Sequence, residues 1–339
     1  MTDPAFIPRG RTSAVRPMLG TEIGHASITL SFFWAMITEI TSCRWEGWME
    51  RLRPGLVLAD RYRLVGHVAS GGMGQVWEVA DSILERRVAM KIMHPHTRDE
   101  IALAERFRDE ARFAAQLAHP NIVTVHDYID HEGLSCLVME FVDGPTLSEL
   151  MASGPLPLED ARMMLLQLAS ALAQAHAAGI IHRDLKPANV LVSEAGAKLT
   201  DFGIARSIDG GSHTVPGQLL GTAYYLSPEQ ALGQPVGPAT DMYGWGLLAH
   251  EMLTGTKVFD KGSPIATALA HVQDEPPTLP PGMPPVLESL VSAALAKEPE
   301  DRPTSALAAE LLEASTGEFH ATPKDAQDPS VPRRAAVDG

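Results

Sequence analysis

Residues 180–203 read IIHRDLKPANVLVSEAGAKLTDFG, and the rest of the 339-residue chain must support the chemistry that these residues carry. They place a carboxylate at Asp184, an amide five positions later at Asn189, and a second carboxylate at Asp201 beyond a short hairpin-like segment. Magnesium prefers hard oxygen ligands and keeps several waters, so a protein usually offers it one or two such groups and lets substrate phosphates complete the shell. Asn189 and Asp201 meet this need. The stretch therefore predicts a site for a divalent metal and a phosphate chain.

Asp184 suits a different role beside that metal. A carboxylate that is near a metal without binding it can orient a hydroxyl nucleophile and accept its proton. Lys186, two positions further on, can offset the charge on a transferred phosphoryl group. We interpret His182 as a structural support of the loop, because Asp184 is better placed by the motif to act as the base.

The segment HRDLKPAN followed by DFG resembles the catalytic loop and metal-binding turn of bacterial eukaryotic-like (Hanks-type) serine/threonine protein kinases. Either triplet alone is weak evidence because each occurs by chance, but their order and spacing together are specific. The resemblance implies an α+β, two-lobed protein-kinase fold. It places a small N-lobe, an antiparallel sheet with one key helix, over residues 56–142, and a larger helical C-lobe over residues 143–314.

The two ends of the chain fall outside this resemblance. Residues 1–48 are interpreted as an N-terminal extension that is not part of the native product, because the segment opening at Met49 resembles the usual start of bacterial kinases. The alternative, an export signal, is only weakly imitated there, and the apolar run is too interrupted for a membrane span. Residues 315–339 are polar and predict a disordered tail.

The charge and cysteine content restrict the class of partner. The chain has 42 acidic residues against 27 Lys and Arg, a net charge of -15, which disfavours nucleic acid because that partner needs clustered basic charge. Its two cysteines, Cys43 and Cys136, are too few and too far apart for a disulfide framework or a zinc knuckle. We therefore expect a reduced, cytoplasmic protein without a membrane span.

The segment ASGGMGQVW connects two strand-like runs, residues 62–68 and 75–80. Its glycines allow backbone amides to approach phosphates without an intervening side chain, and they are Gly71, Gly72 and Gly74. By the resemblance, Val76 would cover the adenine of ATP. The family begins this loop with another glycine where this chain has Ala69, which adds a methyl group and disfavours positive φ. We therefore expect weaker ATP binding, not its loss.

A lysine and a glutamate are the next candidates. The apolar strand VAMK ends in Lys91, and a helix predicted at residues 99–118 carries Glu110 on its apolar stripe. A charge on an apolar face needs a partner, and Lys91 is the obvious one. The resemblance implies the same ion pair, which would position phosphate oxygens.

Two further strand-like runs, residues 124–129 and 134–141, lead into VMEFVDG. By the resemblance, Met139 would guard the back of the adenine pocket. Glu140 and Val142 would supply the linker backbone that hydrogen-bonds the base.

The segment 204–220 resembles an activation loop. Arg183, beside the catalytic aspartate, can pair with a phosphate on this segment and order it by charge-assisted hydrogen bonds. We expect phosphorylation at Thr214 first and Ser212 next, by the kinase itself, with two copies meeting transiently as a homodimer. The alternative is a flexible loop whose small residues serve only to form turns and have no role in phosphorylation.

The segment GTAYYLSPEQ, residues 221–230, resembles the substrate-docking segment of the family and is called the docking segment below. Thr222, with Lys186, marks the serine/threonine branch. The resemblance implies a buried pair of Glu229 with Arg302. Asp241 opens an apolar helix, and we expect it to hold the backbone of the catalytic loop by hydrogen bonds.

The leading hypothesis is a serine/threonine protein kinase that transfers the γ-phosphoryl group of ATP to protein hydroxyls, with Mg²⁺ or Mn²⁺ as the metal. A nucleotide-binding, pseudokinase-like scaffold is the alternative, and Ala69 is its only support. A small-molecule phosphotransferase would not be expected to carry the docking segment. The sequence leaves the protein substrate, the activating signal and the oligomeric state open.

Overall fold

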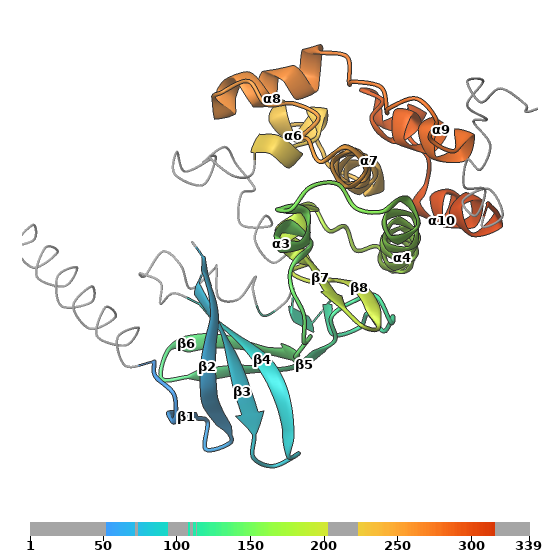
Figure 1. Cartoon of the computed structure of the whole chain (residues 1–339). Coiled ribbons are helices and arrows are strands. Elements are labelled where there is room, and N and C mark those ends of the chain that lie inside the picture. Colours follow the sequence, from blue (N-terminus) through green and yellow to red (C-terminus); the bar gives the residue numbers. More distant parts are fainter. Residues whose placement is uncertain are drawn as a thin grey trace, which may run out of the picture. The chain divides into compact units, whose positions relative to one another are not determined.

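The computed structural model describes residues 52–71, 74–93, 108, 111–112, 114–202 and 223–315, all within the compact unit Leu52–Gly339 (Figure 1). The expected N-terminal extension and almost all of the expected tail lie outside the described residues. So do Gly72, Glu110 and the predicted activation loop with Ser212 and Thr214. In the described part of the chain, no helix is both long and apolar enough to cross a membrane.

The first part of the unit is a six-stranded antiparallel sheet with strand order β1-β2-β3-β4-β6-β5. Residues alternate between buried and exposed at the start of β2 because one face of the sheet packs on the core. The central strand β4 is buried over its last six residues. The strands are β1 (Val57–Leu58), β2 (Tyr62–Gly71), β3 (Gly74–Asp81), β4 (Arg86–Met93), β5 (Val125–His131) and β6 (Leu134–Glu140).

The second part is mainly helical and contains one two-stranded hairpin (Figure 1). Its helices are α3 (Leu147–Met151), α4 (Leu158–Ala177), α6 (Pro228–Ala231), α7 (Pro238–Thr254), α8 (Pro264–Gln273), α9 (Pro285–Ala294) and α10 (Ser305–Ala314). The hairpin is formed by β7 (Val190–Ser193) and β8 (Gly196–Leu199). An antiparallel sheet followed by a helical region confirms the predicted fold class.

The segment before β5 connects to this hairpin by backbone hydrogen bonds. The N–H of Val123 donates to the carbonyl of Leu199 at 2.8 Å, and the N–H of Leu199 donates to the carbonyl of Asn121 at 2.9 Å. The side-chain amide of Asn121 donates to the carbonyl of Ala197 at 2.8 Å. The hairpin that precedes Asp201 is therefore fixed to the sheet-forming part of the chain.

Residues 155–179 have a long helical pattern with apolar residues on one face, and helix α4 buries that face. Its members Leu165, Leu168, Ala169 and Leu172 are all fully buried. From the sequence we interpret Met163 and Met164 as core-filling residues and not as a cofactor site. Met164 packs against the core, but the expectation is wrong for Met163, which is 40% exposed. A residue two positions before Leu165 lies about 200° around a helix, on the opposite side.

Helix α7 packs closely on its neighbours because two glycines flank a tryptophan. A Cβ at Gly244 would lie 3.0 Å from the Leu185 Cβ, and one at Gly246 would lie 3.0 Å from the Ala294 Cβ. Trp245 between them is fully buried, and its indole N–H donates to the carbonyl of Leu165 at 3.0 Å. The small–large–small pattern brings α7 against the catalytic loop and against α9 while the indole reaches α4.

We predict that Trp245→Ala lowers the free energy of unfolding by about 3 to 5 kcal/mol, because it opens a cavity in the core. Urea denaturation monitored by far-UV circular dichroism measures the loss. Met163→Ala, on the exposed face of α4, is the control and should change stability by about 0.5 kcal/mol or less. Equal effects of the two substitutions would contradict this packing assignment.

Candidate active site

The hairpin β7–β8 brings the two predicted metal ligands to one place. Asn189 ends the short 3₁₀ helix Pro187–Asn189 directly before β7, and Asp201 follows β8 by two residues. The N–H of Thr200 donates to the carbonyl of Asn189 at 3.0 Å. Residues twelve positions apart in the sequence therefore lie side by side at the open end of the hairpin.

Asn189 is oriented by Asp184. Its amide nitrogen donates to the Asp184 carbonyl at 2.8 Å and to the Asp184 Oδ2 at 3.1 Å. This use of the nitrogen assigns the amide orientation, so the Oδ1 atom remains as an acceptor. An oxygen acceptor is what a hard cation needs.

The donor set fits a magnesium ion completed by phosphate oxygens. Among the described residues there is no group of three or more His, Cys, Asp or Glu side chains that could hold a metal. A single amide oxygen with one carboxylate is the smaller set that Mg²⁺ usually takes when a nucleotide supplies the other ligands. Asn189 and Asp201 are the residues that would hold it.

The carboxylate of Asp184 is held in one orientation. Its Oδ2 accepts from the Lys186 ammonium at 2.6 Å as well as from Asn189. Its backbone N–H donates to the Nδ1 atom of His182 at 3.3 Å. Asp184, Lys186 and Asn189 thus form one hydrogen-bonded group, as a base with an adjacent cation requires.

Lys91 approaches the predicted metal ligand Asp201 from β4. Its Nζ lies 2.8 Å from the Asp201 Oδ1, and its side chain is 10% exposed. The expected partner Glu110 lies outside the described residues, so the Lys91–Glu110 pair stays a prediction. The structure shows a pair that the sequence reasoning did not name, between the strand lysine and the second carboxylate.

Asp201 and Arg183 both have left-handed backbone conformations, with φ values of 60° and 65°. Such a conformation costs a residue other than glycine about 1 to 3 kcal/mol and persists only where the surroundings impose it. At Arg183 the surroundings are Asp241, whose Oδ1 accepts from the Arg183 N–H at 2.7 Å. The Asp241 Oδ2 accepts from the His182 N–H at 2.8 Å.

Asp241 has a third partner that the sequence did not indicate. The Nε2 atom of His176, in the last turn of α4, lies 2.9 Å from the Asp241 Oδ2, and its Nδ1 lies 2.9 Å from the Ser305 hydroxyl. A histidine at a helix end carries no motif signal, and only the fold brings it to α7. The buried carboxylate therefore joins α4, α7 and the catalytic loop.

His182 connects the two halves of the motif. Its Nδ1 accepts from the Asp184 N–H, so in the neutral tautomer the Nε2–H donates to the Thr200 carbonyl, 3.0 Å away. Its ring packs against the Phe202 ring with centroids 4.8 Å apart. Fully buried, it fixes the catalytic loop to the turn that carries Asp201.

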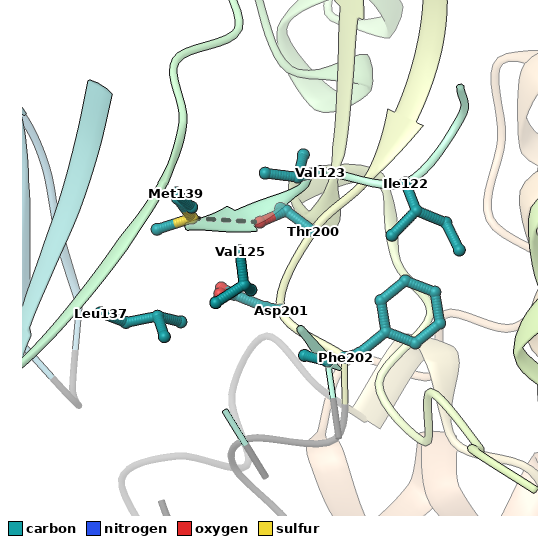
Figure 2. A pocket seen from close by; sticks show the side chains of 9 residues that line it. Ile122, Val123, Val125, Leu137, Met139, Thr200, Asp201 and Phe202 are labelled. Carbon is teal, nitrogen blue, oxygen red and sulfur yellow. Dashed lines mark hydrogen bonds between the residues drawn. The ribbon is translucent and has the colours of Figure 1, made fainter. Parts of the chain in front are cut away.

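Behind Asp201 there is a small cavity of ≈ 10 Å³ (Figure 2). This is close to the least volume that one water molecule needs. The Thr200 hydroxyl lies 4.0 Å from the Met139 sulfur across its upper side. The cavity is lined by Ala114, Ile122, Val123, Val125, Leu137, Met139, Thr200, Asp201 and Phe202.

The predicted adenine linker follows β6. The N–H of Glu140 donates to the Thr124 carbonyl at 2.8 Å, and its carboxylate pairs with Lys198 at 2.8 Å. The N–H of Glu140 is therefore already used within the sheet, and the role of this residue in binding a base stays a prediction. The role of Val142, which is half-buried next to it, stays a prediction.

The glycine-rich hairpin accommodates Ala69. Ala69 pairs with Val76, and Gly71 with Gly74, in the ladder between β2 and β3. Ala69 is not among the described residues with positive φ, so that part of the argument for weaker ATP binding does not apply. Val76 in turn pairs with Lys91 of β4, so strand β3 of the hairpin lies directly beside the strand that carries the lysine.

Glu229 and Arg302 form a buried bidentate ion pair. Arg302 Nη1 and Nη2 donate to the two carboxylate oxygens of Glu229 at 2.8 and 3.0 Å, and the Thr240 hydroxyl donates to one of them at 2.6 Å. Burial raises the pKa of Glu229, but the hydrogen bonds from Arg302 and Thr240 outweigh it, and the net direction is downward.

The docking segment is also bound to the catalytic loop. The side chain of Gln230 donates to the Arg183 carbonyl at 2.8 Å and caps α6 together with Ser227. Tyr225 donates its hydroxyl hydrogen to Glu251 of α7 at 2.6 Å. Thr222 lies outside the described residues.

The fold and this site define the protein kinase class, and comparison with known families agrees. The model of the protein kinase domain matches residues 62–315, so the chain belongs to this family. The predicted resemblance to bacterial serine/threonine kinases is confirmed by its relatives.

The chain is 44% identical over 257 residues to the serine/threonine-protein kinase PknA of Mycobacterium tuberculosis, covering 74% of this chain and 60% of that protein. It is 39% identical over 253 residues to the serine/threonine-protein kinase PrkC of Bacillus subtilis, covering 73% of this chain and 39% of that protein. The match thus spans about two fifths to three fifths of the length of these curated relatives. Among solved structures, the PknI kinase domain of M. tuberculosis superposes with a TM-score of 0.62 at 28% identity, covering 78% of this chain and 99% of that one.

We predict that Arg302→Met destabilises the protein by about 3 to 5 kcal/mol at pH 7, because it leaves the Glu229 carboxylate buried without its cation. A carboxyl whose folded pKa is lowered contributes stability above its unfolded pKa, and this contribution is lost as the pH falls through the folded value. The difference in the free energy of unfolding between Arg302→Met and the wild type should therefore become smaller as the pH is lowered.

Urea denaturation at several pH values measures this difference. Lys261→Met is the control, because the Lys261–Asp274 pair is close, at 2.7 Å, but both side chains are nearly half exposed. Such a pair contributes about 0 to 1 kcal/mol. A loss at Arg302 no larger than at Lys261 would contradict the role of the buried pair.

We predict that Gly74→Ala raises the KM for ATP by roughly tenfold or more, whereas Ala69→Gly does not lower it. Gly74 has a φ of 155°, and a Cβ there would lie 2.9 Å from the Met93 Cα. The strain of about 1 to 3 kcal/mol would drive the hairpin out of this conformation. Steady-state kinetics at saturating acceptor measures the KM for ATP of both variants. A lower KM for Ala69→Gly would support the expectation from the sequence that Ala69 weakens ATP binding.

Proposed function

We propose that the chain is a serine/threonine protein kinase that transfers the γ-phosphoryl group of ATP to protein hydroxyls. The observation that carries the proposal is the group formed by Asp184, Lys186 and Asn189, in which one carboxylate oxygen accepts from both neighbours. This fixes the carboxylate against a cation and beside an amide oxygen that suits a metal. Membership of the protein kinase family and the names of the relatives support the same reaction.

In the reaction, the acceptor oxygen forms a bond to the γ-phosphorus while the bond from that phosphorus to the β,γ-bridging oxygen breaks, and ADP leaves. Asp184 orients the acceptor hydroxyl and takes its proton. Lys186 offsets the negative charge on the transferred group, and Lys91 approaches from β4 to position phosphate oxygens. Bound Mg²⁺, or Mn²⁺ in its place, would neutralise phosphate charge. Asn189 and Asp201 would hold that ion.

The finer parts of the proposal concern regulation. We propose autophosphorylation of Thr214 and Ser212, through a transient homodimer, in a cytoplasmic protein that acts on protein substrates. Arg183 supports this, because it stands next to the base and its backbone is fixed by Asp241 and Gln230. The scaffold alternative depended on Ala69, which fits the β2–β3 ladder without positive φ.

We predict that Asp184→Asn lowers phosphoryl transfer by about 10² to 10⁴, the contribution of a positioned general base. Transfer of label from γ-³²P-ATP to dephosphorylated casein and to the chain itself measures the loss, and mass spectrometry locates the label. In the wild type we expect it on Thr214 and Ser212.

Asp130→Asn, at an exposed position of β5, is the matched control and should retain full activity. Thermal unfolding should show that both variants are folded. Activity of Asp184→Asn within tenfold of the wild type would refute the assigned role. Label that is absent from residues 204–220 would refute the regulatory part alone.

A further inference from the structure

His271, on the buried side of α8, is a polar residue that the reaction described above does not use. Its ring is fully buried, with edge-on contacts to Tyr243 and Phe259 at centroid distances of 5.7 and 5.0 Å. Its Nδ1 lies 3.1 Å from the Tyr243 hydroxyl. Among the described residues its Nε2 has no hydrogen-bond partner. A buried ring nitrogen without a partner is costly and calls for an explanation.

Several groups near the imidazole affect its pKa, and two of them, the backbones of Ala223 and Tyr224, belong to the docking segment. Burial is the largest influence and lowers the pKa of His271 to about 4, Lys297 acts in the same direction, and the backbone of Tyr224 and Ala223 acts in the opposite direction. Backbone groups that favour the protonated form of a histidine are acceptors, which means carbonyl oxygens. These carbonyls are near enough to the ring to affect its pKa, although neither is a hydrogen-bond partner of the Nε2 atom.

The hydrogen on the ring can be assigned from its neighbours. Burial raises the pKa of Tyr243, so its hydroxyl stays protonated and can donate to Nδ1. A neutral imidazole has one donor and one acceptor nitrogen. With Nδ1 accepting from Tyr243, the hydrogen lies on Nε2 and is available to the carbonyls of Ala223 and Tyr224.

We propose that His271 is a positioning residue for the protein acceptor: its Nε2–H donates to a backbone carbonyl of Ala223 or Tyr224 when the acceptor is bound. The inference rests on the proposed kinase function. A small shift of the docking segment completes a hydrogen bond to Nε2 that none of the described residues completes in the free chain. The same segment is bound through Gln230 to the carbonyl of Arg183, the residue before the base, so its position affects where the acceptor hydroxyl lies.

A matched pair of substitutions isolates the Nε2 donor. His271→Gln places an amide nitrogen near the position of Nε2, whereas His271→Asn places its amide near Nδ1. Both remove the ring, so both lose the contacts with Tyr243 and Phe259. Asn retains an acceptor for the Tyr243 hydroxyl, so packing and stability alone predict that Asn is tolerated at least as well as Gln.

We predict the reverse order for acceptor kinetics. With dephosphorylated casein as the acceptor, His271→Asn should raise the KM for casein by about three- to tenfold, the range of one neutral hydrogen bond. His271→Gln should stay within about twofold of the wild type. For both variants the KM for ATP and kcat should stay near wild type. Equal effects of Asn and Gln, or a change in the ATP constant alone, would overturn the inference.

A second measurement does not depend on the variants. Long-range ¹H–¹⁵N spectra of the wild-type chain with ¹⁵N-labelled histidine should show His271 as the neutral Nε2–H tautomer, with its Nε2–H resonance shifting as casein is added. An Nδ1–H tautomer would overturn the inference. If the wild type labels neither casein nor itself, the proposed function fails, and the tautomer still tests the donor assignment separately.

Discussion

The geometry of the catalytic loop depends on one buried carboxylate, that of Asp241. It accepts hydrogen bonds from the backbone N–H groups of His182 and Arg183, and its Oδ2 lies next to the Nε2 of His176. A buried carboxylate without such partners would be costly, so the loop and the carboxylate stabilise each other. These hydrogen bonds maintain the left-handed backbone conformation of Arg183. Because Asp184 is the next residue, this conformation affects the orientation of Asp184.

A second buried charge fixes the docking segment. Arg302, between α9 and α10, donates to Glu229 at the start of α6 and to the carbonyl of Ala239 in the first turn of α7. It also donates to the carbonyls of Ala296 and Lys297. The backbone acceptors hold the Arg302 guanidinium in place, and its ion pair with Glu229 in turn restricts the movement of the docking segment. Gln230, the neighbour of Glu229, connects the docking segment to the catalytic loop, because its side-chain amide donates to the Arg183 carbonyl. The docking segment and the catalytic loop are therefore joined by a side-chain hydrogen bond and not by sequence proximity.

The sequence predicted the parts of the site whose contacts are local or carried by a motif. Asp184, Lys186 and Asn189 lie within six residues, so their spacing alone brings them together. Met163 was misassigned because apolar character was read without its position on the helix face. The contacts of His176 and His271 could not be predicted, because neither residue belongs to a recognisable motif and the partners of both are more than twenty residues away. Long-range hydrogen bonds of single polar residues need the fold before they can be seen.

The buried polar groups of this part of the chain differ in how completely they are satisfied. Asp241 and Glu229 each accept from several donors, which suits groups that hold the backbone in one place. His271 has a partner on one ring nitrogen and, among the described residues, none on the other. The backbones of Ala223 and Tyr224, in the 3₁₀ turn Ala223–Tyr225, are near this ring, and this turn belongs to the docking segment that we propose contacts the acceptor. If the Nε2–H of His271 forms its hydrogen bond only when the acceptor is bound, that bond stabilises the acceptor-bound position of the docking segment. A group that is already hydrogen-bonded in the free chain would stabilise the free and bound positions equally.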